Sequence, residues 1–230
     1  MNNTIKKLSS NAFARILIVI VCWFTSAFLS FQYLYFLKRS NNHLSVKTAS
    51  SHLPEVIIQN IIAIMPTALL LFGSILIWKS HFKNKLFFTI EKKSQKITVA
   101  VLSLILAIMF ICALIVKEDK ITVCYQLIYY LVFISFFEEF EFRGLYPALL
   151  KDKVKDIYVI ILPNILFGMV HIFSYNNFNE PSVASVIGFI TGQFLGLFLI
   201  GLIFETLKRK FGTIWVPILV HAIFDFSGVF

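Results

Sequence analysis

Three glutamates and an arginine stand inside a strongly apolar run, the stretch SFFEEFEFRG at residues 135–144. Ionisable side chains are costly in hydrocarbon, and those found there usually belong to a functional site with partners on other segments. Carboxylates in such a site can take a proton from water or hold a metal ion. The sequence must therefore supply partners and the elements that bring them together.

Helical spacing separates the charged residues of this stretch. Glu139 and Arg143 are four residues apart with the acid first, the favourable order for an ion pair along a helix. Glu138 is turned by about 100° from Glu139, which leaves it free to face His171 as the candidate general base. For Glu141 two orientations stay open, one into the same cavity as Glu138 and one toward a loop.

Composition places these residues in a membrane. The 230 residues are 58% hydrophobic and 14% charged, with a mean hydropathy of +0.83, whereas soluble domains are about 25% charged. The net charge of +9 does not indicate a nucleic-acid partner, because the basic residues cluster between apolar runs, as in loops beside an anionic leaflet. We therefore predict an integral membrane protein surrounded by lipids.

The elements that carry the charged residues are apolar segments of about the 20 residues that a bilayer requires. Their pattern predicts an all-α, polytopic membrane bundle of about seven (six to eight) transmembrane helices in a single membrane domain. Residues 1–120 carry no motif, and residues 121–230 would form the catalytic core. The predicted spans are 12–37, 54–78, 97–116, 121–149, 157–174, 183–207 and 213–230.

Two further features follow from these spans. With the N-terminus inside, fifteen lysines and arginines fall on the inner side and five on the outer side, so the positive-inside rule favours an N-in orientation. Small residues within the spans are expected to permit close helix approach. These residues are Gly168, Gly192, Gly196 and Gly201.

Depth in the membrane links the candidate partners. At 1.5 Å rise per residue, polar groups of three spans lie about 12–20 Å from the inner ends of their helices. These groups are Glu138, His171, His221 and Asp225. Because His221 and Asp225 are four residues apart, they share a helix face. The common depth predicts one buried site.

Three stretches carry a resemblance to a known family. EEFEFRG at 138–144, NILFGMVH at 164–171 and GTIWVPILVHAIFD at 212–225 resemble, in order, the motifs EExxxR, FxxxH and HxxxN/D. These motifs are those of the CAAX protease and bacteriocin-processing family of intramembrane proteases, which includes the type II CAAX prenyl endopeptidases. The ordered set is far more specific than any one motif.

The resemblance implies roles for the first two motifs. Glu138 and His171 would activate a water molecule for attack on a peptide carbonyl. Glu139 and Arg143 would support that arrangement. Glu141 departs from the family pattern, in which the variable positions of the first motif are mostly apolar.

For the third motif the resemblance implies stabilisation of the oxyanion by His221 and Asp225. Asp225 could donate to the oxyanion only if protonated, and could instead orient His221. Such donors can also hold a divalent metal such as zinc, with water in an open position. The residues of that alternative are Glu138, His171, His221 and Asp225; a metal-free site is the other alternative.

These features predict an intramembrane endopeptidase of the bacterial cytoplasmic membrane, acting on a peptide or protein substrate and opening toward the cytoplasm. The resemblance implies a role in bacteriocin processing or self-immunity, and prenylated substrates only if the host prenylates proteins. One alternative is a non-catalytic immunity or binding protein that retains the polar layer. A proton-coupled transporter is less favoured, because paired broken helices in internal repeats are not evident.

Overall fold

The fold is helical throughout the residues that the computed structural model describes, which are 11–77, 88–176 and 182–230. Six helical segments there are long and apolar enough to cross a membrane, and a seventh, Trp215–Val229, is shorter. The predicted polytopic helical membrane bundle is confirmed. The six long segments are Ala12–Arg39, Val46–Leu76, Lys93–Val116, Lys120–Leu150, Asp156–Tyr175 and Val183–Phe211.

Several of these crossings are built from more than one helical element, joined end to end. Elements η2, η3 and η4 are π-helical, whereas η1 and η5 are 3-10 helices. In chain order the elements are α2 (Ala12–Arg39), η1 (Val46–His52), α3 (Leu53–Ile77), α5 (Lys93–Val116), α6 (Lys120–Ile128), η2 (Tyr129–Phe136), α7 (Phe137–Glu139), η3 (Phe140–Leu145), α8 (Tyr146–Leu150), α9 (Asp156–Val170), α10 (Ile172–Tyr175), α11 (Val183–Phe189), η4 (Ile190–Phe194), α12 (Leu195–Phe211), α13 (Trp215–Phe226) and η5 (Ser227–Val229).

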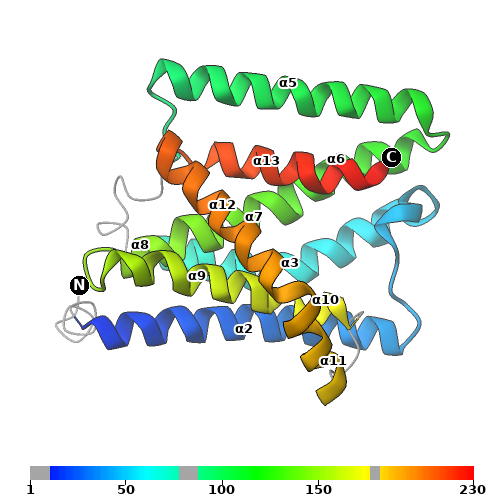
Figure 1. The fold of residues 1–230 in the computed structure, drawn as a ribbon. Coiled ribbons are helices and arrows are strands. Elements are labelled where there is room, and N and C mark those ends of the chain that lie inside the picture. Colours follow the sequence, from blue (N-terminus) through cyan, green and yellow to red (C-terminus); the bar gives the residue numbers. More distant parts are fainter. Residues whose placement is uncertain (1–10, 78–87, 177–181) are drawn as a thin grey trace.

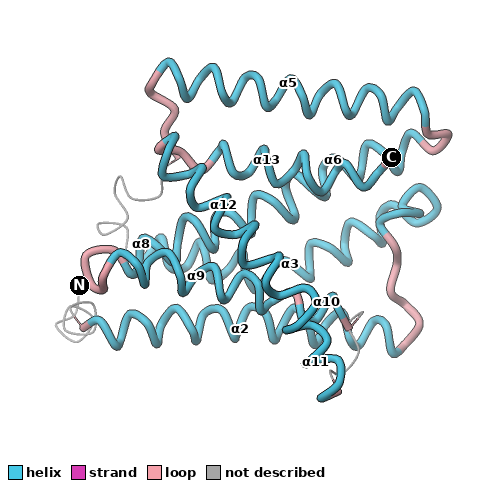
Figure 2. Tube along the Cα trace, in the orientation of Figure 1, coloured by secondary structure: helices cyan, strands magenta, loops and turns pink. Residues whose placement is uncertain are grey.

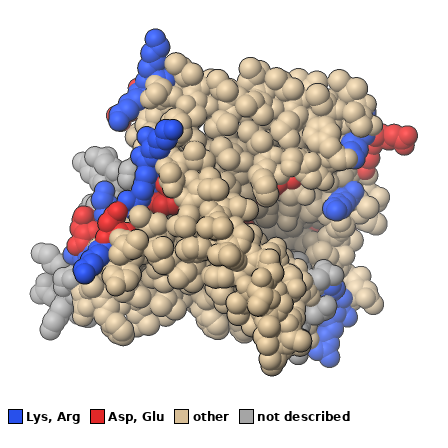
Figure 3. Space-filling view, in the orientation of Figure 1, with Lys and Arg blue, Asp and Glu red and all other residues tan. Residues whose placement is uncertain are grey.

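The long helices run roughly side by side, with α2 at one edge of the bundle and α5 at the other (Figure 1). Helix α2 packs on α3, α5 packs on α13, and the slanting α12 contacts both α9 and α13. Lysines and arginines lie at the two ends of the bundle, with a broad uncharged surface between them (Figure 3). This distribution is that of a protein with a lipid-facing belt.

Local sequence sets where several helices begin and end. The Asn11 side chain accepts a hydrogen bond from the Phe13 backbone N–H at 3.0 Å and caps α2. Gly212 ends α12 in a left-handed conformation, with φ +67°. Pro217 lies in the first turn of α13, where its missing N–H leaves no helical hydrogen bond unmade.

The segment 120–150 is one unbroken helical path in the tube view (Figure 2). Within it the single α turn of α7, Phe137–Glu139, stands between the π-helical elements η2 and η3. A π-helical turn contains more residues than an α turn, and such turns are frequent at functional sites. The sequence analysis treated this segment as a regular helix, because hydropathy does not distinguish the two forms.

A polar junction joins two crossings where η1 and α6 begin. Asp119 caps α6 by accepting a hydrogen bond from the Thr122 backbone N–H at 3.0 Å, and it also accepts one from the Ser50 hydroxyl. The Ser50 backbone N–H donates to the Thr122 hydroxyl at 3.0 Å. Hydrogen bonds from Ser50 and Thr122 lower the pKa of Asp119 below its ordinary value.

Replacement of Asp119 by alanine should lower the unfolding temperature in detergent by about 2–4 °C, because the cap of α6 and the tie to η1 are both lost. The folded state lowers the pKa of Asp119. Its contribution is therefore present above the ordinary pKa and is lost as the pH falls through the folded value. Thermal unfolding of the wild-type and Asp119→Ala proteins at neutral and acidic pH measures this contribution. Glu118→Gln, at the exposed neighbouring position, is the control, and an equal fall of its unfolding temperature would contradict the role of Asp119.

Candidate active site

His221 of α13 lies among three carboxylates. Its Nδ1 is 2.9 Å from Glu139 Oε1, and because a carboxylate only accepts, Nδ1 donates. Its Nε2 is 3.4 Å from Asp225 Oδ2 and 3.9 Å from Glu138 Oε2. The glutamates of α7 and the last helix therefore meet around one imidazole, as the common depth predicted.

The expected ion pair between Glu139 and Arg143 is present and fully enclosed. Arg143 Nη1 is 3.2 Å from Glu139 Oε1, and the two side chains are 1% and 0% exposed. A second guanidinium nitrogen donates to Asn164 Oδ1 at 3.3 Å, and the guanidinium carbon lies 4.2 Å from the centroid of the Phe167 ring. Glu139 thus accepts from both Arg143 and His221, which links η3 to α13.

The hydrogen bond of His171 fixes its tautomer. Its Nδ1 lies 2.8 Å from the backbone oxygen of Phe167, and because a carbonyl oxygen can only accept, Nδ1 carries the proton. Nε2 is left as an acceptor. The Phe167 ring also packs edge-on against the His171 ring, with 5.0 Å between centroids. Phe167 therefore contacts both Arg143 and His171 and holds the second motif against the first.

A cavity of about 690 Å³ lies beside the glutamates and His171. Its lining includes Glu138, Glu141, His171 and Asp225, and the space-filling view shows a hollow in this face of the molecule (Figure 3). His221 is 5% exposed and is not among the lining residues. Glu138 and His171 thus share one cavity, and His221 lies behind it.

The carboxylate of Glu138 is turned partly into this cavity. Its side chain is 23% exposed, while Oε2 is buried on the side of His221 without a hydrogen bond in the described part of the chain. Among the described residues, no ion pair joins Glu138 to His171 directly. The two groups therefore line one cavity without pairing with each other in the described part of the chain.

The side chain of Glu141 points into the cavity. Its Oε1 accepts hydrogen bonds from the Tyr146 hydroxyl and, at 3.3 Å, from the Ser26 hydroxyl of α2, and the side chain lines the cavity. The alternative in which Glu141 points toward a loop is wrong. The Ser26 and Tyr146 partners were not predictable from the sequence, because a hydroxyl in an apolar run is an ordinary occurrence.

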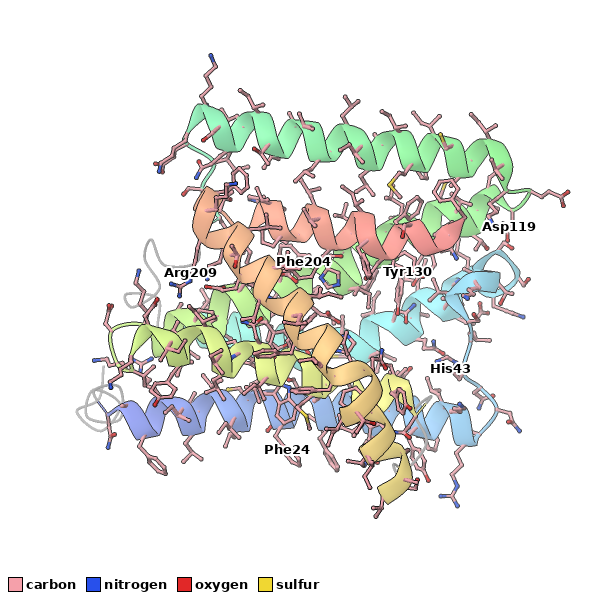
Figure 4. All side chains as sticks on the ribbon, in the orientation of Figure 1. Phe24, His43, Asp119, Tyr130, Phe204 and Arg209 are labelled. Carbon is pink, nitrogen blue, oxygen red and sulfur yellow. The ribbon has the colours of Figure 1, made fainter. Side chains whose placement is uncertain are left out.

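Two supporting residues were missed in the sequence. Asn164 accepts from Arg143 and donates to the Ile160 backbone oxygen at 2.7 Å; its signal was a lone amide in an apolar span. Phe204 of α12 stacks on His221, with centroids 4.9 Å apart (Figure 4 labels Phe204). It is one of 26 phenylalanines, so composition could not single it out.

The glycine prediction is correct at two positions and wrong at two. A Cβ at Gly201 would lie 2.5 Å from Asn164 Oδ1 and 2.9 Å from an Arg143 nitrogen, and one at Gly168 would meet the Phe194 ring at 2.8 Å. At Gly192 and Gly196 a Cβ would have no neighbour within 4 Å. Hence α12 approaches the buried arginine at Gly201, whereas Gly196 nearer its start and Gly192 of η4 face open space among the described residues.

The side chains proposed as metal ligands do not form a recognisable metal site. Within the described ranges, no three histidine, cysteine, aspartate or glutamate side chains are grouped as ligands of one ion. His221 uses Nδ1 for Glu139 and His171 uses its own Nδ1 for a backbone oxygen. These hydrogen bonds leave Nε2 of both imidazoles for a further partner, as in histidines that bind a metal, and zinc coordination by Glu138, His171, His221 and Asp225 stays a prediction.

The fold and the site define a polytopic helical membrane protein with a buried glutamate–histidine centre. Residues 120–227 match the family model described as "Type II CAAX prenyl endopeptidase Rce1-like". This part of the chain belongs to that family of membrane proteases, and the resemblance inferred from the three motifs is confirmed. No curated protein and no solved structure matches the chain.

Replacement of Gly201 by alanine should damage the site, because the added methyl group collides with the Arg143–Asn164 pair. Overpacking of this kind costs about 1–3 kcal/mol. We expect a lower unfolding temperature and a loss of any activity that depends on the site. Gly196→Ala is the matched control on the same helix, and equal behaviour of the two variants would contradict the packing described.

Proposed function

We propose that this protein is an intramembrane endopeptidase that hydrolyses a peptide bond with a water activated by Glu138 and His171. The observation that carries the proposal is the convergence of these two residues on one cavity, backed by the His221–Glu139 hydrogen bond. Membership of residues 120–227 in a family of membrane proteases supports it.

Glu138 serves as the general base. It takes one proton from water while Nε2 of His171 accepts a hydrogen bond from the same molecule, and the resulting hydroxide adds to the peptide carbonyl carbon. When the carbon–nitrogen bond breaks, Glu138 returns the proton to the leaving amine. The carboxylate is regenerated, and two peptide fragments leave the cavity.

The negative charge on the carbonyl oxygen needs a donor in the same place. Asp225 lines the cavity, so in this scheme its protonated carboxyl donates to the oxyanion, and Nε2 of His221, 3.4 Å from Asp225 Oδ2, orients it. Glu139 fixes the other face of the imidazole, and Arg143 balances the charge of Glu139. Glu139 and Arg143 act in this scheme as positioning residues.

The proposed substrate is a peptide or protein segment that enters the membrane. Processing of a bacteriocin, or self-immunity against one, in a bacterial cytoplasmic membrane is the biological setting that the family resemblance supports. The scheme has no step that requires a prenyl group on the substrate or a metal ion in the site.

Replacement of Glu138 by glutamine should reduce cleavage by about 10²–10⁴-fold, because the amide cannot take a proton from water. Peptides released in membranes that contain the wild-type protein are compared with those from Glu138→Gln and His171→Ala at matched expression. Glu118→Gln, at an exposed position outside the cavity, is the control that should retain the wild-type peptide set. Identical peptide sets in all four membranes, with biological activity intact, would instead indicate a non-catalytic immunity protein.

Removal of divalent metals should leave cleavage unchanged if the site works through Glu138 and His171 without an ion. The purified protein is dialysed against a strong chelator, and its cleavage rate is compared with that of a sample returned to zinc. Metal content is measured in parallel. Loss of cleavage on chelation and full recovery with zinc would overturn the metal-free scheme while leaving the protease assignment in place.

A further inference from the structure

The cavity begins beside residues 129–142, in the middle of the crossing Lys120–Leu150, and extends toward one end of the bundle. Its lining residues lie at 23–34 in α2, at 59–67 in α3, at 170–174 around α10 and at Asp225 in α13. It also includes residues 43–46, the loop that follows α2. Because neighbouring helices run in opposite directions, these positions all lie toward the end of the bundle opposite the start of α2. The cytoplasmic opening expected from the sequence does not match this lining.

Figure 4 shows the same arrangement from the side. The labelled His43 and Tyr130, both lining residues, lie toward the end of the bundle that carries Asp119, whereas Arg209 lies toward the other end. In the N-in orientation favoured by the basic residues, the Asp119 end is the outer end. His43 and Ser45 are exposed there, so the cavity reaches the surface on the outer side.

The inner side of the site is closed by buried charge and packed leucines. Lys208 Nζ donates to the Arg143 backbone oxygen at 3.0 Å and is 2.9 Å from Glu205 Oε2. Lys208 and Glu205 are 4% and 2% exposed, and Leu149 and Leu150 are 0% exposed. Close-packed side chains of this kind leave no passage for a peptide. Among the described residues, these side chains separate Glu138 from the inner end.

The outer rim is held in place by Gln59 of α3. The Leu44 backbone N–H donates to Gln59 Oε1 at 2.9 Å, and Gln59 Nε2 donates to the Leu44 backbone oxygen at 3.0 Å. One side chain thus satisfies both backbone groups of a loop residue, as a neighbouring strand would do. The loop forms a fixed side of the cavity mouth.

The walls between this rim and Glu138 combine bulky apolar side chains with small polar ones such as Ser30 and Asn60. They include Phe31 and Phe173, which stack with 4.5 Å between ring centroids, and the aromatic face of Tyr129 and Phe133. Within the described residues, the charged side chains that line the cavity are acidic, and neither lysine nor arginine contributes. A segment with large apolar side chains suits this cavity, whereas an acidic segment would be repelled.

We propose that the active-site cavity opens on the outer face of the membrane and receives, from that side, peptide segments that carry bulky apolar residues and lack acidic ones. The cleavage part of this inference rests on the proposed function. The direction of opening does not, and it can be tested without any cleavage.

The direction is tested with single cysteines in a background where Cys22, Cys112 and Cys124 are alanine. A small, charged, membrane-impermeant methanethiosulfonate is added to intact cells. Ile134→Cys, one turn before Glu138 in the cavity lining, should react at least about 10-fold faster than Val132→Cys, because thiolates form in water and not in lipid. Val132 is the matched control, since it is 42% exposed and outside the lining.

Two further variants fix the orientation. Ser45→Cys at the rim should be labelled in intact cells, and Lys155→Cys, at the opposite end before α9, only after the cells are permeabilised. Ser30→Cys, a nearly isosteric change in the lining, repeats the cavity test from α2 if Ile134→Cys fails to fold. Labelling of both cavity cysteines only in inverted vesicles, or of Lys155→Cys in intact cells, would overturn the outer opening.

The inference about cleavage is tested in a separate experiment. Glu138→Gln combined with Ile134→Cys should be labelled as fast as Ile134→Cys alone, which shows that the opening is independent of the chemistry. For a protein that cleaves, outside labelling of Ser45→Cys with a bulky impermeant maleimide should reduce cleavage at least about 10-fold, while the same label on Glu118→Cys should not. Outer labelling without any cleavage would refute the proposed function alone; cleavage unaffected by the rim label would refute this inference alone.

Discussion

The site depends on a single carboxylate, that of Glu139, which accepts hydrogen bonds from Arg143 and from His221 at the same oxygen. A charge as deeply buried as this one is stable only when it is paired and hydrogen-bonded. Both of its partners come with further contacts, because Arg143 lies over Phe167 and His221 stacks on Phe204. Four crossings are thereby fixed relative to one another around a group that does not itself line the cavity.

The residues that hold the site together are different from the residue proposed to act on water. The enclosed pair of Glu139 and Arg143 faces the packed interior, whereas Glu138, one residue earlier, is partly exposed to the cavity. Adjacent residues on a helix point in different directions, so one short stretch supplies both a buried anchor and an accessible base. Breaking a buried pair by removing one partner costs about 3–5 kcal/mol, which makes Arg143 as important for the position of Glu138 as any residue that contacts it.

Much of the fold was predictable, because lipid imposes a length on every crossing and hydropathy reports that length directly. The predicted span 157–174 and the observed Asp156–Tyr175 differ by one residue at each end. The Glu139–Arg143 pair was also predictable, since it depends only on spacing along one helix. Local sequence rules were sufficient for these features.

Features that depend on how helices face one another were not predictable in the same way. Spacing could not tell that Gly201 meets the buried arginine and that Gly196 faces open space. It could not show that Glu141 reaches Ser26 on the first crossing, or that the cavity extends toward the 43–46 loop. Each of these facts is set by rotation of a whole helix about its axis, which hydropathy leaves undetermined in a chain that is apolar on all sides.

The two π-helical elements around α7 give the site a dependence on chain length as well as on residue identity. A π turn is equivalent to an α turn with one residue added. If the stretch 129–136 became regular α-helix with all its residues kept, everything after it would be rotated by about 100° relative to what comes before it. The acid pair would then point away from His221 although every motif residue was still present. A chain with one residue fewer in this stretch would keep the same geometry through a regular α-helix.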